Sequence, residues 1–190
     1  MKNGKYQALG FRYLWVLALF LCFGFALNTV SAQETAVPAG FSVSFGLNDL
    51  AGDFGTSLGI QSPLILSHAV VRIEGVLQWY NDPGSSEIWY LYTVARAGLA
   101  GYSDMLSNFV RLYGYGGIEF AFPGLWTEYI DTEAFRFGGY GGFGFEFFFV
   151  PSFCYYIELG TTGSGARSRF EPRLYRNGFQ TTVGLRFFLK

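Results

Sequence analysis

The segment 135–149 most restricts how this chain can fold, because its side chains alternate in character at every residue. It reads FRFGGYGGFGFEFFF. The odd-numbered positions are six phenylalanines and two glycines, whereas the even-numbered positions carry Arg136, Tyr140, Glu146 and Phe148 beside three glycines. Successive side chains of a β-strand point to opposite faces of its sheet. We therefore predict a strand with one aromatic face and one face that carries charge.

The same alternation recurs along the chain and predicts eight strands separated by turn residues. Their ranges are 40–47, 54–61, 68–80, 87–99, 108–122, 135–149, 153–162 and 177–189. With 22 phenylalanines and 13 tyrosines in the chain, the aromatic faces are too large for the core of a small soluble domain. An even number of strands, apolar toward lipid and polar toward a lumen, is typical of membrane barrels. We predict an all-β fold, an eight-stranded antiparallel up-and-down transmembrane β-barrel.

The first 32 residues have the pattern of a cleavable signal peptide. Three basic residues among the first twelve precede an apolar run at 13–27, and small residues follow at 30–32. A spanning helix needs about 20 apolar residues, more than this run provides, so a signal peptide is favoured over a membrane anchor. The predicted organisation is a signal peptide at 1–32, a short lead at 33–39 and the outer-membrane β-barrel at 40–190.

Cleavage at this point leaves a mildly acidic chain. Of 13 basic and 14 acidic residues, three basic ones lie in the first segment, so 10 basic and 14 acidic residues remain, a net charge of −4. No basic face with interleaved aromatic residues is present, so we expect no nucleic-acid partner. A single cysteine, Cys154, remains, and it cannot form an internal disulfide.

The lengths of the connections predict which end of the barrel faces outward. If the first strand starts in the periplasm, the two longest connections, 123–133 and 163–176, fall outside the cell. The shortest connection, 150–152, falls on the periplasmic side. Outer-membrane barrels have short periplasmic turns and longer external loops.

On these strands the chain resembles the small eight-stranded bacterial outer-membrane β-barrel families, the OmpA transmembrane domain and OmpX among them. The resemblance covers residues 40–190 and implies a bacterial outer-membrane location. The last strand, 182–189, is similar to the C-terminal signal read by the barrel-assembly machinery in those families, although this chain ends on Lys190 instead of an aromatic residue. We expect no peptidoglycan-binding domain of the OmpA family after this barrel.

Charged residues recur on the strand face opposite the phenylalanines. They are Arg72, Glu74, Arg96, Arg111, Glu119, Arg136, Glu146, Glu158 and Arg186. Buried charges persist when they are paired and hydrogen-bonded, and Arg matches carboxylates well. We predict a salt-bridged network that fills the lumen, since an eight-stranded barrel is just wide enough for side chains. The alternative is a narrow gated pore whose pairs exchange partners to pass ions or small solutes.

The sequence offers little for catalysis. The one histidine, His68, is predicted at the periplasmic end, and a lone histidine without a positioned partner is a poor candidate for a base. The glycine run at 138–144 lacks the strand–loop–helix context of a phosphate-binding loop. We interpret these glycines, which lie beside outward aromatic residues, as sites where the rings lie flat over the backbone and the sheet can curve. We expect no enzyme activity, no cofactor and no metal, and we interpret Cys154 as a small inward-facing residue.

The predicted external loops carry opposite charges. The 163–176 loop holds one group of arginines, Arg167, Arg169, Arg173 and Arg176. These side chains could simply be solvated, or they could bind the phosphates of lipopolysaccharide, which Arg contacts in bidentate fashion. Aromatic residues at both predicted rims are typical of interfacial girdles. They are Trp79, Trp89 and Trp126 at the external rim and Phe187 and Phe188 at the periplasmic rim.

These observations predict a monomeric, non-enzymatic outer-membrane protein that contacts outer-membrane lipid and serves envelope structure or surface interaction through its external loops. The gated pore remains the first alternative. The second is an exported ligand-binding barrel of the lipocalin type, which would require the aromatic face to point inward.

Overall fold

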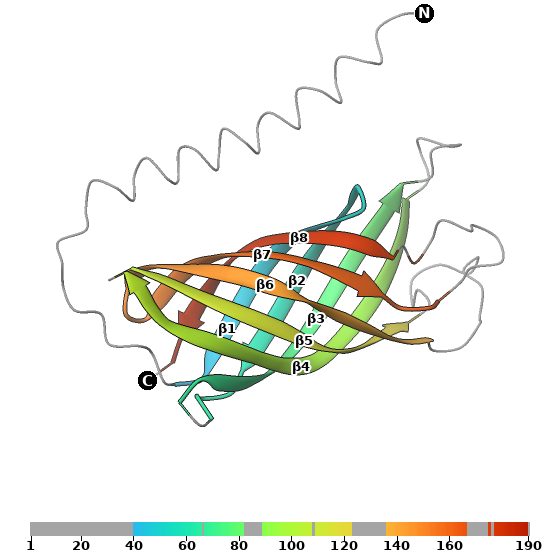
Figure 1. The fold of residues 1–190 in the computed structure, drawn as a ribbon. Helices are drawn as coiled ribbons and strands as arrows, with labels where there is room; N and C mark the ends of the chain where they lie inside the picture. The colour runs from blue at the N-terminus through green and yellow to red at the C-terminus, as the bar shows by residue number, and fades with distance from the viewer. Residues whose placement is uncertain are drawn as a thin grey trace, which may run out of the picture. The chain divides into compact units, whose positions relative to one another are not determined.

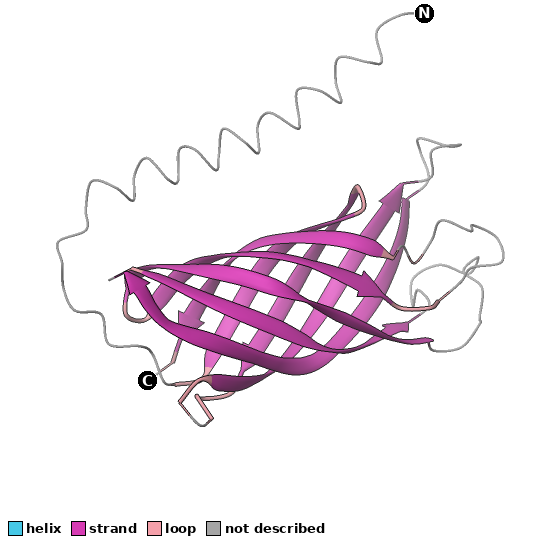
Figure 2. Ribbon diagram, viewed as in Figure 1, coloured by secondary structure: helices cyan, strands magenta, loops and turns pink. Residues whose placement is uncertain are grey.

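The computed structural model describes residues 40–65, 67–81, 89–107, 109–122, 136–166, 175 and 177–189. All regular secondary structure in these residues is β-strand (Figure 2). No helix among them is long and apolar enough to cross a membrane. The predicted signal peptide and the lead at 33–39 lie outside the described residues and stay predictions.

Eight strands form one closed antiparallel barrel, in which each strand pairs with its neighbours in the chain and β1 pairs with β8 (Figure 1). The strands are β1 Ser42–Leu50, β2 Asp53–Gln61, β3 Ala69–Asn81, β4 Trp89–Ser107, β5 Val110–Phe122, β6 Arg136–Val150, β7 Phe153–Gly163 and β8 Gly178–Phe188. The predicted number of strands, their antiparallel pairing and their closure are confirmed. Closure leaves no unpaired sheet edge.

The connections between strands divide between two ends of the barrel. We name the end that joins β2 to β3, β4 to β5 and β6 to β7 the turn end. The loop end joins the other four pairs. The shortest predicted connection, between β6 and β7, lies at the turn end, and both long predicted connections, after β5 and after β7, start at the loop end, in agreement with the sequence prediction.

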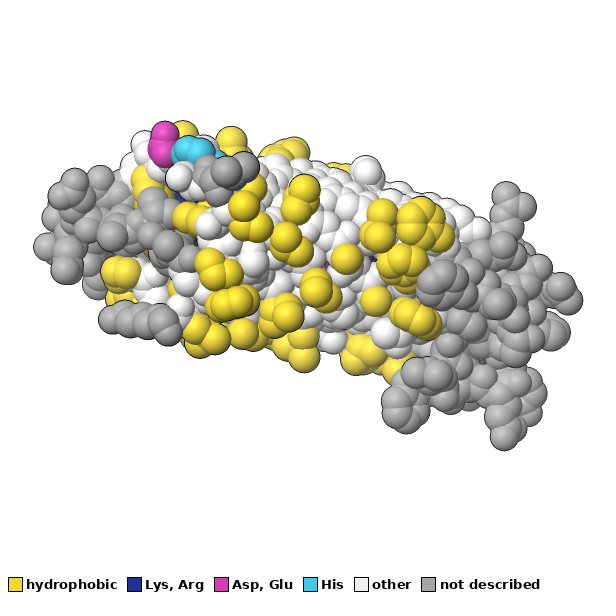
Figure 3. Space-filling model, turned by 90° about the horizontal axis from the view of Figure 1, so that it is seen from below, with side chains coloured by type: hydrophobic (Ala, Val, Ile, Leu, Met, Phe, Trp, Pro, Cys, Tyr) yellow, Lys and Arg dark blue, Asp and Glu magenta, His cyan; other side chains and the backbone are white. Residues whose placement is uncertain are grey.

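The apolar face of each strand points outward. Leu58 on β2 is 64% exposed and Phe137 on β6 is 60% exposed, whereas neighbouring polar residues such as Ser57 are buried in the lumen. Figure 3 shows hydrophobic side chains spread over the barrel wall, where Lys, Arg, Asp and Glu side chains are almost absent. The predicted orientation is confirmed. The lipocalin-type alternative is wrong, because it requires these aromatic side chains to line the interior.

Two predicted connections have other bounds in the structure. The turn expected between the predicted strands at 40–47 and 54–61 is shorter than the segment 48–53, because β1 continues to Leu50 and β2 begins at Asp53, so that only Ala51 and Gly52 form the turn. Asn48 turns its side chain into the lumen and accepts a hydrogen bond from Thr182 there. Polar residues that usually mark turns are thus lumen residues in this barrel.

The sequence also predicts a link over 101–107, between the strands at 87–99 and 108–122, and this is wrong, since β4 extends through it to Ser107. Tyr102 anchors this extension, because its ring packs on Tyr113 with centroids 5.0 Å apart and its hydroxyl donates to Gln61 at 2.9 Å. The register between β4 and β5 shifts twice beyond Tyr102. Such irregularities are common at the rims of barrels. The sequence was misleading here because Gly101, next to Tyr102, has the character of a turn residue.

Candidate functional site

Eight charged side chains project into the lumen from six consecutive strands, β3 to β8. They are Arg72, Glu74, Arg96, Arg111, Glu119, Glu146, Glu158 and Arg186, and each is at most 5% exposed. Four arginines meet four glutamates, so the group is neutral as a whole. Arg136, the ninth predicted member, begins β6, and its side chain lies outside what the structure describes.

The group forms one chain of alternating sign. From the turn end it runs Arg111, Glu146, Arg186, Glu158, Arg72, Glu74, Arg96 and Glu119, and each member forms an ion pair with the next. Each internal member thus lies between two opposite charges. This alternation lets eight ionised groups occupy an interior without net charge, the condition under which buried charges are tolerated.

At the turn end Glu146 is the shared acceptor. Arg111 donates to its Oε2 from Nε at 2.9 Å and from Nη2 at 2.6 Å, and Arg186 donates to its Oε1 from Nη1. Arg186 Nη1 also donates to the hydroxyl of Tyr102 at 3.1 Å. Both oxygens of one carboxylate are therefore engaged by two guanidinium groups from β5 and β8.

At the centre Glu158 performs the same role for a pair that crosses the barrel. Arg72, on β3, donates to Glu158 on β7 from Nη1 at 2.7 Å and from Nη2 at 3.3 Å, a bidentate geometry that adds strength and direction to an ion pair. Tyr113 donates its hydroxyl to the same carboxylate at 2.7 Å, and Arg186 Nη2 lies 3.7 Å away. The Arg72–Glu158 ion pair thus connects two strands, β3 and β7, that are not neighbours in the barrel.

Toward the loop end the pairs are looser and neutral groups join them. Glu74 Oε2 lies 3.6 Å from Arg72 and 3.7 Å from Arg96. Arg96 donates to Glu119 at 3.2 Å and to Gln180 at 2.7 Å, and Thr162 donates its hydroxyl to Glu119. The loop-end half of the charge chain thus depends on a mixed polar network.

Tyrosine rings fill the space that the ion pairs leave. Tyr102, Tyr113, Tyr115 and Tyr140 follow one another across β4, β5 and β6, with successive centroids 5.0, 6.1 and 6.1 Å apart. Each of the four lumen arginines also lies over a tyrosine ring, the closest being Arg111 at 4.0 Å from the Tyr102 centroid. The rings therefore contribute cation–π attraction as well as volume.

Inward-facing glycines make room for these rings. Gly144 lies opposite Tyr113 in the β5–β6 register, and a Cβ on it would come within 2.5 Å of the tyrosine ring. Gly184 lies opposite Tyr156, with a corresponding distance of 2.6 Å. The sequence predicted that glycines accommodate rings of the outward aromatic residues, and this is wrong for Gly144, because the rings over Gly144 and Gly184 point into the lumen. These rings belong to lumen tyrosines, Tyr113 and Tyr156, and not to the outward phenylalanines.

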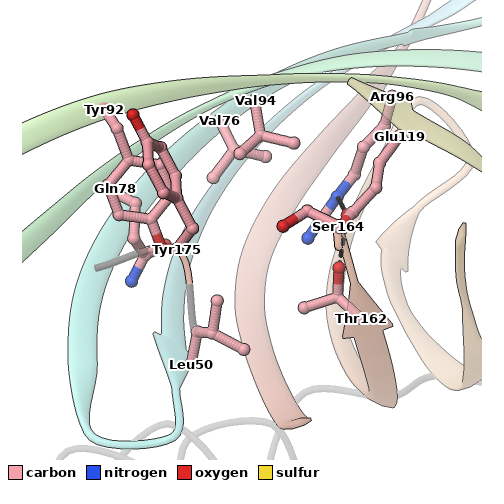
Figure 4. A pocket seen from close by; sticks show the side chains of 10 residues that line it. All are labelled: Leu50, Val76, Gln78, Tyr92, Val94, Arg96, Glu119, Thr162, Ser164 and Tyr175. Atoms are coloured by element: carbon pink, nitrogen blue, oxygen red, sulfur yellow. Dashed lines mark hydrogen bonds and ion pairs between the residues drawn. The ribbon is translucent and has the colours of Figure 1, made fainter. Parts of the chain in front are cut away.

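Buried apolar groups, named here the closing groups, pack at both ends of this network. At the turn end the closing group includes Val70, Ala100, Tyr102 and Tyr113. At the loop end it includes Val76, Tyr80, Tyr92, Val94, Ala121, Ala166 and Tyr175. Figure 4 shows the cavity that lies between the loop-end group and the Arg96–Glu119 pair. Its volume is about 10 Å³, at the lower limit for a single water molecule.

Of the remaining predicted residues, His68 lies away from this network, Cys154 lies beside it, opposite Arg186 in the β7–β8 register, and the loop arginines lie outside the described residues. His68 is exposed in the β2–β3 connection at the turn end, the end predicted for it. Cys154 is buried and faces inward, as expected. The loop arginines Arg167, Arg169, Arg173 and Arg176 lie outside the described residues, as does Trp126. Among the described residues, no group of three or more His, Cys, Asp or Glu side chains could hold a metal ion.

Sequence reasoning missed the neutral members of the network. Gln180 accepts from Arg96, and its amide donates to Thr182 at 3.1 Å. Asn48 accepts from Thr182 at 2.6 Å. The signal was present, since Gln180 and Thr182 alternate with outward residues on the last strand. Alternation places these side chains on the lumen face, but it does not show that they bind the charged groups.

Comparison with known proteins supports the architecture. No protein-family model matches the chain, and the search of curated proteins found no match. Among solved structures, the N-terminal β-barrel domain of Pseudomonas aeruginosa OprF matches with a TM-score of 0.57 and 9% sequence identity, covering 81% of this chain and 100% of that one. The Yersinia pestis outer membrane protein Ail, in a phospholipid bilayer nanodisc, matches with a TM-score of 0.51 and 11% identity, covering 80% and 99%.

The chain has the fold of a small outer-membrane β-barrel. This fold combines an apolar outer wall with a lumen of side chains, and both features are present here. At these identities the likeness concerns the fold alone, so what the barrel does must be argued from its own lumen and surface.

Proposed function

We propose that this chain is a bacterial outer-membrane β-barrel with a closed, salt-bridged lumen, that it is not an enzyme, and that it serves envelope structure or surface interaction through its loop-end connections. The turn end faces the periplasm and the loop end faces outward, because short turns are periplasmic in such barrels. In this setting the outward phenylalanines contact lipid and the protein functions as a monomer.

The observation that carries the proposal is the continuous charge chain between the two closing groups. Eight charged side chains and the tyrosines beside them occupy the lumen, and the cavity between Arg96 and the loop-end closing group has room for about one water molecule. Steady passage of hydrated ions requires a continuous aqueous path. Opening one would require several ion pairs to separate together in a low-dielectric interior, which is costly.

Conductance in planar bilayers tests the closed lumen. The refolded mature chain is expected to insert without producing a steady open channel of porin size. Insertion itself is checked by the slower or faster gel mobility that folded barrels show before heating. Brief, small openings would support the narrow gated pore instead, and steady large conductance would contradict the filled lumen.

Fractionation tests the proposed location. The mature chain should remain with outer membranes and require detergent for extraction, because 19 large apolar side chains of the strands, Leu58 and Phe137 among them, lie exposed on the barrel wall. Recovery of the folded chain in the soluble fraction without detergent would exclude a membrane location.

Contact with lipopolysaccharide is a further part of the proposal and concerns the arginines of the β7–β8 connection. Reversal of Arg167, Arg169, Arg173 and Arg176 to glutamate should reduce the lipopolysaccharide that co-purifies with the barrel, because bidentate contacts to phosphate are lost. Arg111 cannot serve as a control position, because its charge is buried in the lumen. The control is a second variant with glutamine at the same four loop positions, which removes the positive charges without introducing negative ones. If the amount of co-purified lipopolysaccharide is unchanged in both variants, the proposed contact is contradicted.

A further inference from the structure

Tyr175 belongs to the connection between β7 and β8, yet its side chain lies inside the loop end of the lumen. It is 6% exposed and belongs to the apolar group that also contains Val76 and Val94. Its ring meets the ring of Tyr92 edge to face, with centroids 5.1 Å apart and planes at 67°, a favourable arrangement for two aromatic rings. Figure 4 shows the two rings together at one side of the cavity.

The backbone of Tyr175 does not favour this placement. Its φ is 60°, in the left-handed region that residues with a Cβ rarely adopt. A residue held there persists only where its surroundings compensate for the strain. The contact of its ring with Tyr92 and the apolar packing around it contribute to this compensation. The pocket thus stabilises an aromatic ring at this place.

The pocket also holds a polar group without a partner. Tyr92 is 2% exposed, and its hydroxyl has no hydrogen-bond partner among the residues that the structure describes. Buried hydroxyl groups nearly always have one. The other wall of the same cavity is polar, since Arg96 donates to Glu119 and Thr162 donates to the same carboxylate. Small-ligand sites are usually lined by apolar side chains together with a few polar groups such as the Tyr92 hydroxyl.

We propose that the loop end of the lumen is a binding site for a small free phenol, and that Tyr175 of the chain occupies this site as an internal competitor. The ligand ring takes the place of the Tyr175 ring against Tyr92, between Val76 and Val94. The ligand hydroxyl reaches the unpartnered hydroxyl of Tyr92. Binding releases Tyr175 from its strained conformation, so the loss of its contacts is partly offset.

Binding of p-cresol to the folded mature barrel tests this site by equilibrium dialysis against matched detergent micelles. The wild-type barrel should bind one p-cresol saturably, because the ligand displaces Tyr175. Tyr175→Ala should bind at least tenfold more tightly, since the internal competitor is gone. Tyr175→Phe keeps the competing ring and should stay within about threefold of wild type. Tyr92→Phe in the Tyr175→Ala background should weaken binding about fivefold by removing one hydrogen bond.

The wild-type arm distinguishes a native site from an artificial cavity. If Tyr175→Ala binds p-cresol but the wild-type barrel shows no saturable binding up to the solubility of the ligand, the substitution created the cavity and the proposal is overturned. Equal binding by wild type and Tyr175→Ala would place the ligand elsewhere and overturn it as well. Gel mobility before and after heating confirms that each variant is folded. The assay needs neither a bilayer nor conductance, so its outcome is independent of the closed-lumen test.

Discussion

At the scale of single residues, the lumen is organised by carboxylates that each serve two or more donors. Glu158 is the clearest case, because it accepts from Arg72 and Tyr113 and lies 3.7 Å from Arg186. A buried ion pair adds little net stability compared with well-packed apolar groups. Removal of one partner is costly, however, because the other charge stays buried without compensation. The charge chain is therefore most sensitive to changes that break its alternation.

Glu158→Gln should lower the free energy of unfolding by about 3–5 kcal/mol, since it leaves Arg72 and Arg186 with one carboxylate fewer in a dry interior. Denaturant titration of the barrel in micelles measures the loss. The double variant with Arg72→Gln should recover part of it, because the excess positive charge is gone. The exposed control Asp104→Asn should stay within about 0.5 kcal/mol of wild type. Equal stabilities for Glu158→Gln and Asp104→Asn would show that the network does not support the fold.

At the scale of strands and turns, alternation predicted which side chains face lipid and which face the lumen, but it did not predict register. Glu74 lies directly opposite Arg96, and Arg96 opposite Glu119, on adjacent strands. A slip of two residues would preserve the alternation and lose these pairs, so a period of two cannot select among them. The ends of strands could not be predicted either, because Asn48 and Gly101 are of residue types that favour turns and yet lie within strands.

The β1–β2 turn contains a residue that does not suit it. Ala51 and Gly52 have φ values of 51° and 96°, as a tight hairpin with two left-handed residues requires. Ala51→Asn should raise the free energy of unfolding by about 0.5–1 kcal/mol, because asparagine tolerates this conformation better than alanine. Ala51→Val should lower it, since a β-branched residue is poorly tolerated there. Denaturant midpoints of the two variants should move in opposite directions, and a shift in the same direction would contradict the turn geometry.

At the scale of the whole molecule, the excess of aromatic residues over what a small core can hold was enough to predict a closed barrel with its apolar face outward. What the sequence could not supply is contact across the lumen. Arg72 and Glu158 lie 86 positions apart on β3 and β7, and only closure of the barrel brings them together. The entry of Tyr175 into the lumen was hidden for the same reason, because nothing in its local sequence marks it as buried.

The central claim is that the phenylalanine-bearing face contacts lipid while the charged face encloses the lumen. Spin labels at single cysteines along β1 and β2 test it directly, in a Cys154→Ser background and in lipid bilayers. Labels at Val43, Phe45 and Leu58 should be relaxed strongly by oxygen and weakly by a water-soluble nickel chelate, because these side chains point outward. Labels at Ser44 and Ser57 should be shielded from both reagents by the filled lumen. Oxygen access that is the same on both faces, or nickel access to the phenylalanine face, would contradict the account.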